Sequence, residues 1–236
     1  MEFTIFFLCF LFSFQLDKLS QSFVYSSEDI GIVLDVYFDS TQYYVLTTNA
    51  VAIGNYDNIG LTKVFTISNV FNISAIKKIG DYYGIACTNT NLLEYYDSSG
   101  NSLYNQSYDP ENFVKNDYKC SIDNVGSNYI VVGHVNLLTS GNYSFDACIF
   151  KKDDEKILNY KGAKSISNEK IEDSVPTIRC IALTISENKV MCIFLSNTPF
   201  YFIIDVTSEE EAVVSHQLTQ KQYLQLKLFN QVHQSI

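Results

Sequence analysis

The side chains best suited to catalysis are three histidines that lie far apart in the sequence. His134, His216 and His233 have no Gly-x-Ser-x-Gly or other nucleophile motif near them, although a Ser, His and Asp set could converge in space. Without such a motif, a histidine is more often an ordinary strand or surface residue than a general base. The sequence therefore predicts no catalytic residue, and we expect a protein that is not an enzyme.

Aspartates recur at the predicted ends of strands, at Asp35, Asp39, Asp57 and Asp97. A carboxylate in such a position can accept hydrogen bonds from the amides of a turn. The alternative is a calcium site or the carboxylate pair of a glycosidase. The spacing matches no calcium-binding loop, so turn formation is the favoured interpretation. We predict no metal site and no cofactor.

The cysteine count bears on the redox compartment. Six cysteines are present, and Cys9 lies in an apolar N-terminal run. The remaining five are an odd number, which in an oxidising compartment means two disulfides and one thiol, or a partner outside this chain. Cys180 and Cys192 fall on two successive predicted strands, so they are the first disulfide that we predict. No C-x-x-C motif and no Cys and His cluster at zinc spacing occurs in the sequence.

The N-terminal segment indicates the secretory pathway. Residues 3–14 are an unbroken run of apolar or small residues, too short to span a bilayer but suited to the core of a signal peptide. We predict a signal peptide at 1–22 and a mature domain at 23–236 that is secreted or lies at the cell surface, with no further membrane span. Glu2 stands where a positive charge is usual, which leaves open a buried strand or helix at the start of the fold.

Three N-glycosylation sequons agree with secretion. They begin at Asn72, Asn105 and Asn142, and each fits the Asn-x-Ser pattern of an acceptor site. In a chain this rich in Asn, some sequons are also expected by chance. We therefore predict a glycoprotein from the sequons and the leader together.

Composition favours an all-β fold and excludes some partners. The chain has 236 residues, 47% of them hydrophobic, with 17 Tyr, 17 Phe, no Trp and only 3 Pro, which suits strand surfaces better than helices. The formal charge of −10 opposes binding to a phosphate backbone or an anionic membrane. Nucleic acid is therefore excluded as an expected partner.

The strands that would position these residues repeat along the chain. QYYVLTTNAVAIGNYD at 42–57 resembles DYYGIACTNTNLLEYYD at 81–97 in its paired tyrosines, its Thr-Asn turn and its closing Tyr-Asp. Tyr43 and Tyr82 are separated by the length of one propeller blade. In the second copy, residues 98–101 are predicted to form the turn before the next strand, because Gly100 and Asn101 tolerate the positive φ angles that such turns use. Two less similar copies follow, at 128–150 and 188–206.

We predict a β-propeller-like fold of about four four-stranded antiparallel blades. The predicted blades, with the start of a fifth, are residues 32–67, 73–107, 119–160, 178–216 and 222–231. Residues 151–175 hold much of the charge, so we expect a solvated outer hairpin and connector there. The pattern leaves two alternatives: the blades close as a small ring, or the ring is incomplete and the chain is the N-terminal part of a longer propeller.

The two clearest copies resemble the repeats of NHL and YVTN type β-propellers. The resemblance rests on residues 43–53 and 82–103, where a strand, an Asn turn and a second strand follow one another. The sequence lacks the Gly-Gly pair of kelch repeats and the Trp-Asp pair of WD repeats. Because such propellers commonly serve as extracellular binding platforms, the resemblance implies interaction more than catalysis.

These observations predict a secreted or cell-surface binding domain of unknown ligand, or the N-terminal fragment of a larger surface protein. A protein or glycan partner would meet the loops at one end of the blades. The alternative is a secreted glycosidase-like hydrolase on a propeller scaffold, in which two carboxylates would face each other across the central channel.

Overall fold

The structure is a computed structural model of the whole chain. It describes residues 31–56, 58–70, 73–108, 120–137, 143–154, 158–168, 179–195, 200–208 and 214–217. Within these ranges the chain forms sixteen β-strands and the turns between them, with no helix. No helix that could span a membrane is therefore found among the described residues.

The strands form four sheets of four strands, which we number as blades 1 to 4 in chain order. Blade 1 consists of β1 (Val33–Phe38), β2 (Gln42–Thr47), β3 (Ala50–Asn55) and β4 (Asn58–Thr66). Blade 2 consists of β5 (Ala75–Ile79), β6 (Tyr82–Ala86), β7 (Asn91–Tyr96) and β8 (Ser102–Ser107). Blade 3 consists of β9 (Ser121–Val125), β10 (Tyr129–Leu137), β11 (Tyr143–Lys152) and β12 (Leu158–Asn168). Blade 4 consists of β13 (Arg179–Ser186), β14 (Lys189–Leu195), β15 (Phe200–Asp205) and β16 (Val214–Gln217).

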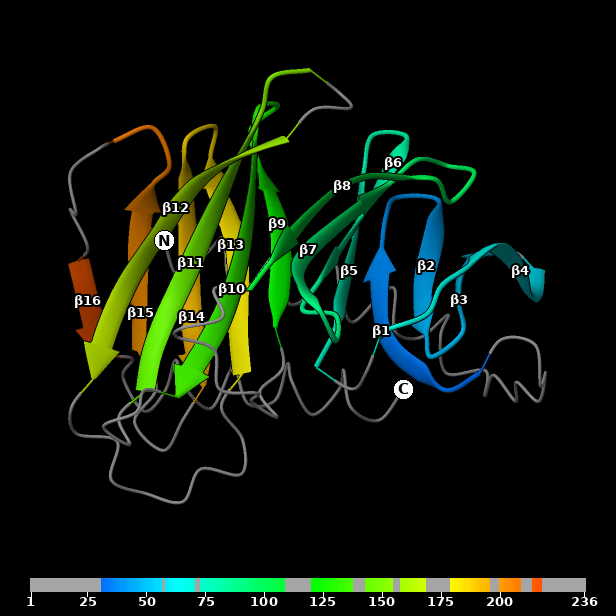
Figure 1. Cartoon of the computed structure of the whole chain (residues 1–236), viewed down its shortest axis with the longest axis horizontal. Helices are drawn as coiled ribbons and strands as arrows, with labels where there is room; N and C mark the ends of the chain where they lie inside the picture. The colour runs from blue at the N-terminus through cyan, green and yellow to red at the C-terminus, as the bar shows by residue number, and fades with distance from the viewer. Residues whose placement is uncertain are drawn as a thin grey trace.

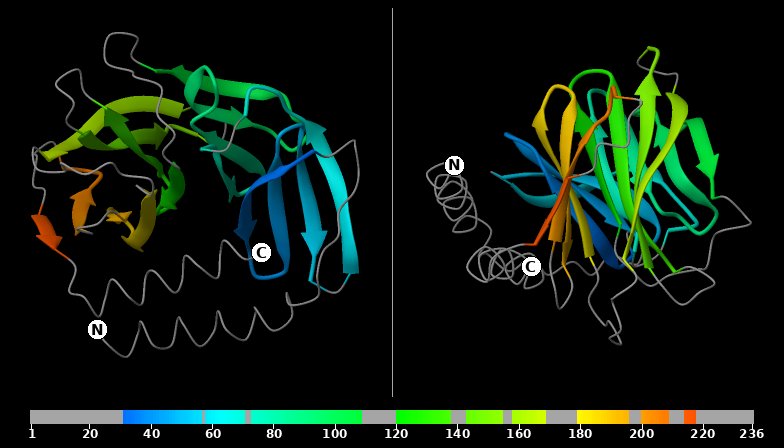
Figure 2. Two further views of the ribbon diagram at one scale, coloured as in Figure 1. Left: turned by 90° about the horizontal axis from the view of Figure 1, so that it is seen from below. Right: turned by 90° about the vertical axis from the view of Figure 1, so that its left-hand side faces the viewer.

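Each blade is an up-and-down antiparallel sheet, and the blades stand side by side (Figure 1). The first strands of successive blades contact one another, β1 with β5, β5 with β9 and β9 with β13, so we call them the inner strands. Seen along the inner strands, the four blades follow an arc (Figure 2). The prediction of an all-β, propeller-like fold with four four-stranded blades is confirmed.

Apolar side chains fill the spaces between neighbouring blades. Leu46 and Ile85 belong to the core between blades 1 and 2, and Leu93 and Phe150 belong to the core between blades 2 and 3. All four are fully buried, and burying each such side chain stabilises the fold by about 1.5–3 kcal/mol. Apolar residues of blade 2 thus pack in two cores, one shared with blade 1 and one with blade 3, and we call the packed contact between two neighbouring blades a joint.

The Thr-Asn turn shared by the first two repeats has a physical role. Thr47 ends β2, and its hydroxyl oxygen accepts a hydrogen bond from the amide of Ala50 at 3.0 Å. Thr88 does the same after β6, accepting from the amide of Asn91 at 3.1 Å. Both threonines are fully buried. In each of these two blades a threonine hydroxyl three residues before the next strand thus satisfies a turn amide; this residue is Thr88 of the Thr-Asn pair in blade 2 and Thr47, just before the Thr48-Asn49 pair, in blade 1.

One strand extends further than the sequence predicts. β12 runs from Leu158 to Asn168 and pairs with β11, although residues 151–175 were expected to form a hairpin and a connector with only a short strand. The cause is the position of β12 at the outer edge of blade 3, where Asn159, Tyr160 and Lys161 are exposed. An outer strand needs no apolar alternation, so its sequence does not indicate a strand. The start of a fifth blade, predicted at 222–231, lies outside the described residues.

Candidate functional site

A line of contacts along the inner strands connects all four blades. Lys77 of β5 places its ammonium nitrogen 4.4 Å from the ring centre of Tyr37 on β1 and 2.6 Å from Oδ1 of Asp123 on β9. The other oxygen of Asp123 accepts hydrogen bonds from the backbone amide and the hydroxyl of Thr184 on β13, at 2.9 and 3.0 Å. We call these four residues the inner line.

Asp35 makes a related contact between blades 1 and 2. Its Oδ2 accepts a hydrogen bond from the backbone amide of Ile76 at 2.9 Å. The sequence suggested a turn-capping aspartate here, but Asp35 lies inside β1. Asp35 and Asp123 are the carboxylates of the inner strands within the described residues, and each is engaged with the next blade. These contacts give a glycosidase mechanism no support, because both groups already serve blade-to-blade bonds.

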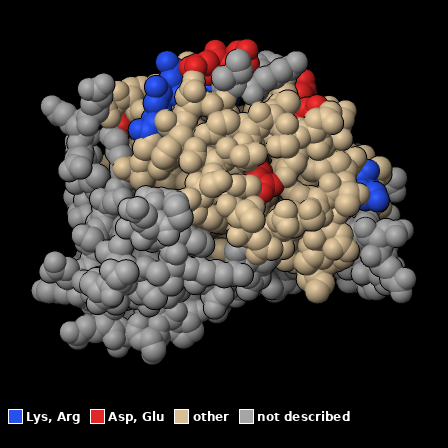
Figure 3. Space-filling model, viewed as in Figure 1, with Lys and Arg blue, Asp and Glu red and all other residues tan. Residues whose placement is uncertain are grey.

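The turns of all four blades bring carboxylates to one end of the arc, the upper end in Figure 1. They come from the turns after the first and third strands of the blades: Asp39, Asp81, Asp97, Asp153, Asp154, Glu187 and Asp205. Lys151, Lys152 and Lys189 lie among them. Figure 3 shows Asp and Glu side chains along this upper edge, with a group of Lys or Arg beside them. We call this surface the acidic end.

Some of these carboxylates also stabilise the turns by accepting hydrogen bonds. Asp97 accepts hydrogen bonds from the amides of Ser99 and Asn101, both at 2.9 Å, and from the side chain of Asn101 at 2.8 Å. The bond from the Asn101 side chain is the largest cause that holds the pKa of Asp97 below its ordinary value. Bonds from Thr207 lower the pKa of Asp205 in the same way. The turn-forming role predicted for Asp39 and Asp97 is therefore present, and the carboxylate of Asp97 stays charged at neutral pH.

At the opposite end, the described turns of blades 1 and 2 differ in charge from the acidic end. These turns comprise residues 48–49, 67–70, 73–74 and 87–90, which contain Thr, Asn, Ser and apolar residues but no charged one. Several of these groups bond each other, as when the amide of Asn89 donates to the carbonyl oxygen of Asn69 at 2.6 Å. In blades 1 and 2 the described turns of the two ends therefore offer different surfaces to a partner.

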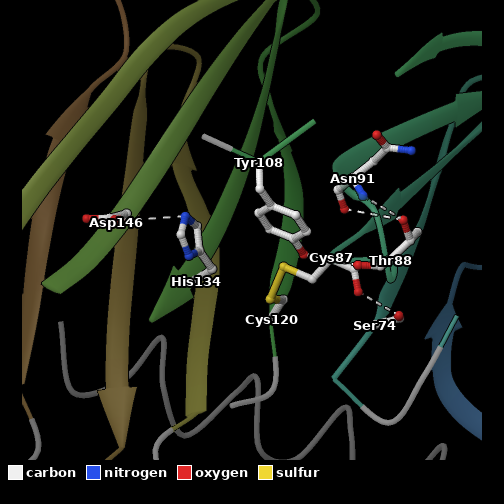
Figure 4. The surroundings of a disulfide bond; sticks show 8 residues. All are labelled: Ser74, Cys87, Thr88, Asn91, Tyr108, Cys120, His134 and Asp146. Carbon is white, nitrogen blue, oxygen red and sulfur yellow. Dashed lines mark hydrogen bonds and ion pairs between the residues drawn. A yellow bond between two sulfur atoms is a disulfide. The ribbon is translucent and has the colours of Figure 1, made fainter. Parts of the chain in front are cut away.

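A disulfide between Cys87 and Cys120 joins blades 2 and 3. Cys87 follows β6 and adopts a positive φ of 55°, and its carbonyl oxygen accepts a 2.8 Å hydrogen bond from the hydroxyl of Ser74. Cys120 precedes β9, and its amide donates to the carbonyl oxygen of Ile73 at 2.9 Å. Both sulfurs lie in the core between the two blades (Figure 4), so this bond fixes the joint.

A buried histidine and aspartate pair lies close to the disulfide. His134 on β10 and Asp146 on β11 are register partners, and 3.6 Å separates Nε2 of the histidine from Oδ2 of the aspartate. Burial lowers the pKa of His134, and the carboxylate of Asp146 opposes part of this shift. The pair lies in the same region as Tyr108 and Cys120 (Figure 4).

Blade 2 also contains a buried carboxylate with three donors. Glu94 is 5% exposed and accepts hydrogen bonds from the hydroxyl of Thr88 at 2.7 Å and the side-chain amide of Asn91 at 2.8 Å. The hydroxyl of Tyr96 donates a third bond, and burial together with this bond raises the pKa of Tyr96. A carboxylate held by three donors acts as a structural acceptor rather than as an acid or base.

The remaining predicted sites are placed only in part. Asn105 lies on β8, the outer strand of blade 2, and is exposed together with Ser107 of the same sequon. Asn72 and Asn142 lie outside the described residues, as do His233 and Asp57. No group of three His, Cys, Asp or Glu residues that could hold a metal occurs in the described part of the chain.

The predicted Cys180–Cys192 disulfide stays a prediction. Both cysteines lie on paired strands, β13 and β14, but the register places Cys180 opposite Phe194 and Cys192 opposite Ala182. Cys180 and Cys192 are therefore two residues out of register and lie on a diagonal across the strand pair. Sequence reasoning missed the Cys87–Cys120 bond because it joins two blades and not two neighbouring strands. The repeat offered a signal, since Cys87 directly follows the second strand of its blade and Cys120 directly precedes the first strand of the next blade.

The chain has only distant matches among known proteins. No family model and no curated protein matches the chain. Among solved structures, the N-terminal domain of Nup159 matches with 15% identity and a TM-score of 0.46, over 80% of this chain and 48% of that chain. An S. cerevisiae complex of Dbp5 with Nup159, Gle1, IP6 and ADP matches with 17% identity and a TM-score of 0.47, over 79% of this chain and 47% of that chain.

A third structure, apo AztD from Citrobacter koseri, matches with 8% identity and a TM-score of 0.43, over 78% of this chain and 46% of that chain. This chain thus covers about half the length of each of these three structures. At these identities and TM-scores the matches support no argument about function.

Proposed function

We propose that the protein is a secreted or cell-surface binding domain whose partner, a protein or a glycan, meets the acidic end of the blades. We include in this proposal that the repeats are of the NHL and YVTN propeller type. The N-terminal run at 3–14 and the three sequons support export. The function rests on the site and not on the fold class, since propellers serve many functions.

The acidic end is the observation that carries the proposal. Turns from four separate blades converge there, and each contributes at least one carboxylate. Loops held by a rigid scaffold are the usual place for recognition, because their side chains vary without disturbing the core. Carboxylates attract a cationic partner and repel nucleic acid and anionic lipid. A basic protein surface, or a neutral glycan that bonds to carboxylates, therefore suits this end best.

The position of Asn105 is compatible with this arrangement. It lies on the outer strand β8, between the two ends of the blade. A glycan there would cover an exposed strand edge, which otherwise tends to pair with other strands. Such a glycan would leave the turns of the acidic end accessible.

Export is tested by expressing the full chain in secretory cells. We expect the protein in the medium or at the cell surface, with a mass that falls after enzymatic removal of N-glycans. Asn105→Gln should remove the mass of one glycan, and Ser107→Ala should do the same because it destroys the same sequon. Ser102→Ala, on the same strand but outside the sequon, is the matched control. A protein that stays cytosolic and unglycosylated would exclude the proposal.

Binding is tested separately with purified protein on arrays of glycans and of basic peptides. A variant with Asp81→Asn and Glu187→Gln reduces the charge of the acidic end without removing the turn caps Asp39, Asp97 and Asp205. A variant with Ser68→Ala and Thr90→Ala changes the opposite end. We expect the first variant to bind any captured probe about tenfold more weakly than the second variant does. Binding by the unaltered protein should also weaken as the salt concentration rises, because charges contribute to it. Equal retention by both variants would place binding elsewhere.

A further inference from the structure

The joint between blades 2 and 3 contains two ionisable side chains that the proposed function does not use. His134 and Asp146 are each only 6% exposed, and they face each other on the two central strands of blade 3. A histidine is the side chain whose charge changes most readily between about pH 5 and 8. A buried histidine at a joint therefore raises the question of what happens when it takes up a proton.

The pair points into the joint and not toward blade 4. Val132 precedes His134 by two residues on β10, and Cys148 follows Asp146 by two residues on β11. Both neighbours belong to the core between blades 2 and 3, and alternate residues of a strand share a face. His134 and Asp146 therefore face blade 2, on the side where Tyr108 lies (Figure 4).

The groups around the imidazole leave Asp146 as its charged neighbour among the described residues. Tyr108 donates to the carbonyl oxygen of Thr88 at 3.3 Å, and burial raises its pKa, with Cys148 and Glu94 adding to the effect. Tyr108 therefore stays neutral in this pH range. On the side of β9, Cys120 belongs to the disulfide and does not titrate. Within the described part of the chain, an imidazolium in this joint would have the carboxylate of Asp146, at 3.6 Å, to balance its charge.

We propose that His134 and Asp146 make the joint between blades 2 and 3 sensitive to acid, so that the joint is packed at neutral pH and loosens when His134 takes up a proton. A neutral imidazole fits the apolar core at little cost, whereas a buried imidazolium loses its hydration. The 3.6 Å gap to Asp146 is longer than a charge-assisted hydrogen bond and compensates only in part. Water that enters the joint, or a movement of blade 2, must then supply the remaining stabilisation of the imidazolium charge.

The pH range follows from the direction of the shift. The pKa of His134 in the folded protein lies below the ordinary 6.5, so the unfolded chain binds the proton more readily as the pH falls. Stability is therefore fully present above about pH 6.5 and is lost as the pH falls through the folded pKa. The turn carboxylates Asp97 and Asp205 have pKa values below their ordinary 3.8, so their contribution is lost at lower pH and does not overlap.

The experiment measures the unfolding midpoint of the full chain from about pH 7.5 to about pH 5. We expect the midpoint to fall with pH, and the fall to shrink by at least half in His134→Gln, an uncharged variant that can still donate to Asp146. His216→Gln and His233→Gln are the matched controls and should keep the fall of the unaltered protein. Hydrogen exchange should rise in β10 and β11 at the lower pH before it rises in blade 1. A fall that persists in His134→Gln, or that disappears equally in a control, would overturn the proposal.

A second measurement decides the matter if His134→Gln fails to fold. The ring signals of the three histidines are followed by NMR in the unaltered protein and assigned by comparison with His216→Gln and His233→Gln. We expect His134 to titrate below 6.5, with line broadening in Tyr108 over the same pH range. A His134 pKa at or above 6.5 would overturn the proposal.

Discussion

The ammonium nitrogen of Lys77 and the carboxylate of Asp123 are 2.6 Å apart and connect the inner strands of blades 2 and 3. Their side chains are only 17% and 13% exposed, so this pair is screened from solvent far better than a surface ion pair. Lys77 also lies over Tyr37 of blade 1, and Asp123 also binds Thr184 of blade 4. Two side chains thus bring all four blades into one network.

Removing either member of this pair should destabilise the fold. Asp123→Ala leaves the ammonium of Lys77 and the amide of Thr184 without their acceptor, and we expect a loss of about 2–4 kcal/mol. Lys77→Met keeps the apolar stem and leaves Asp123 with its bonds to Thr184, so a smaller loss of about 1–2 kcal/mol is expected. Urea denaturation gives both values.

A double-mutant cycle separates the pair from its neighbours. The combined Lys77→Met and Asp123→Ala variant should lose less than the sum of the two single losses, because the second change removes a group that already lacks its partner. Lys189→Met, which alters an exposed lysine at the start of β14, is the control and should change stability by less than about 0.5 kcal/mol. Strict additivity would show that the contact contributes nothing to the joint.

Removal of the Cys87–Cys120 disulfide should have an effect set by the length of the loop that it closes. The sequence separation is 33 residues, for which the loss of loop-closure entropy in the unfolded chain corresponds to about 3–4 kcal/mol. Cys87→Ser with Cys120→Ser should lower the unfolding midpoint accordingly. Peptide mapping of the unreduced protein should recover the peptides of the two residues joined by one bond.

The same peptide map also tests the Cys180–Cys192 pairing. A linked peptide that contains both residues would support that prediction. A reducing agent applied to the double serine variant provides the control, since it should not lower the midpoint further if no other disulfide contributes. A Cys87 peptide recovered without Cys120 would contradict the bond seen in the joint.

The sequence predicts the blades better than it predicts the contacts between them. Strand and turn signals are local, so the paired tyrosines and the Thr-Asn turn suffice to locate β2, β3, β6 and β7. The contacts of Asp123 and Cys120 cross from one blade to the next, and no local pattern contains both partners. His134 shows the same limit: its sequence context gives no reason to expect Asp146 opposite it, because the β10–β11 register depends on a turn of variable length.

The buried tyrosines of the joints should make the fold sensitive to alkali. Burial is the main cause that raises the pKa of Tyr83 from 10.0 to about 12, so the folded protein retains this proton while the unfolded chain releases it near pH 10. Stability should therefore be lost as the pH rises above about 10. The phenolate absorbance near 295 nm of the folded protein should lag behind that of the protein in denaturant. Tyr83→Phe should reduce the alkaline loss, whereas Tyr160→Phe, which changes an exposed ring, should not.

Gly100 should tolerate a side chain poorly, for two independent reasons. Its φ of +84° is disfavoured for other residues, and an added Cβ would lie 2.5 Å from the Cβ of Phe65 on the neighbouring blade. Gly80 has a similar φ of +60°, but an added Cβ meets no atom within 4 Å. Gly80→Ala therefore measures the backbone cost alone, about 1 kcal/mol, and Gly100→Ala should cost about 1–3 kcal/mol more. If urea denaturation gives the two variants equal stability, the turn after β7 does not pack against Phe65, and the joint between blades 1 and 2 ends closer to the inner strands than the structure has it.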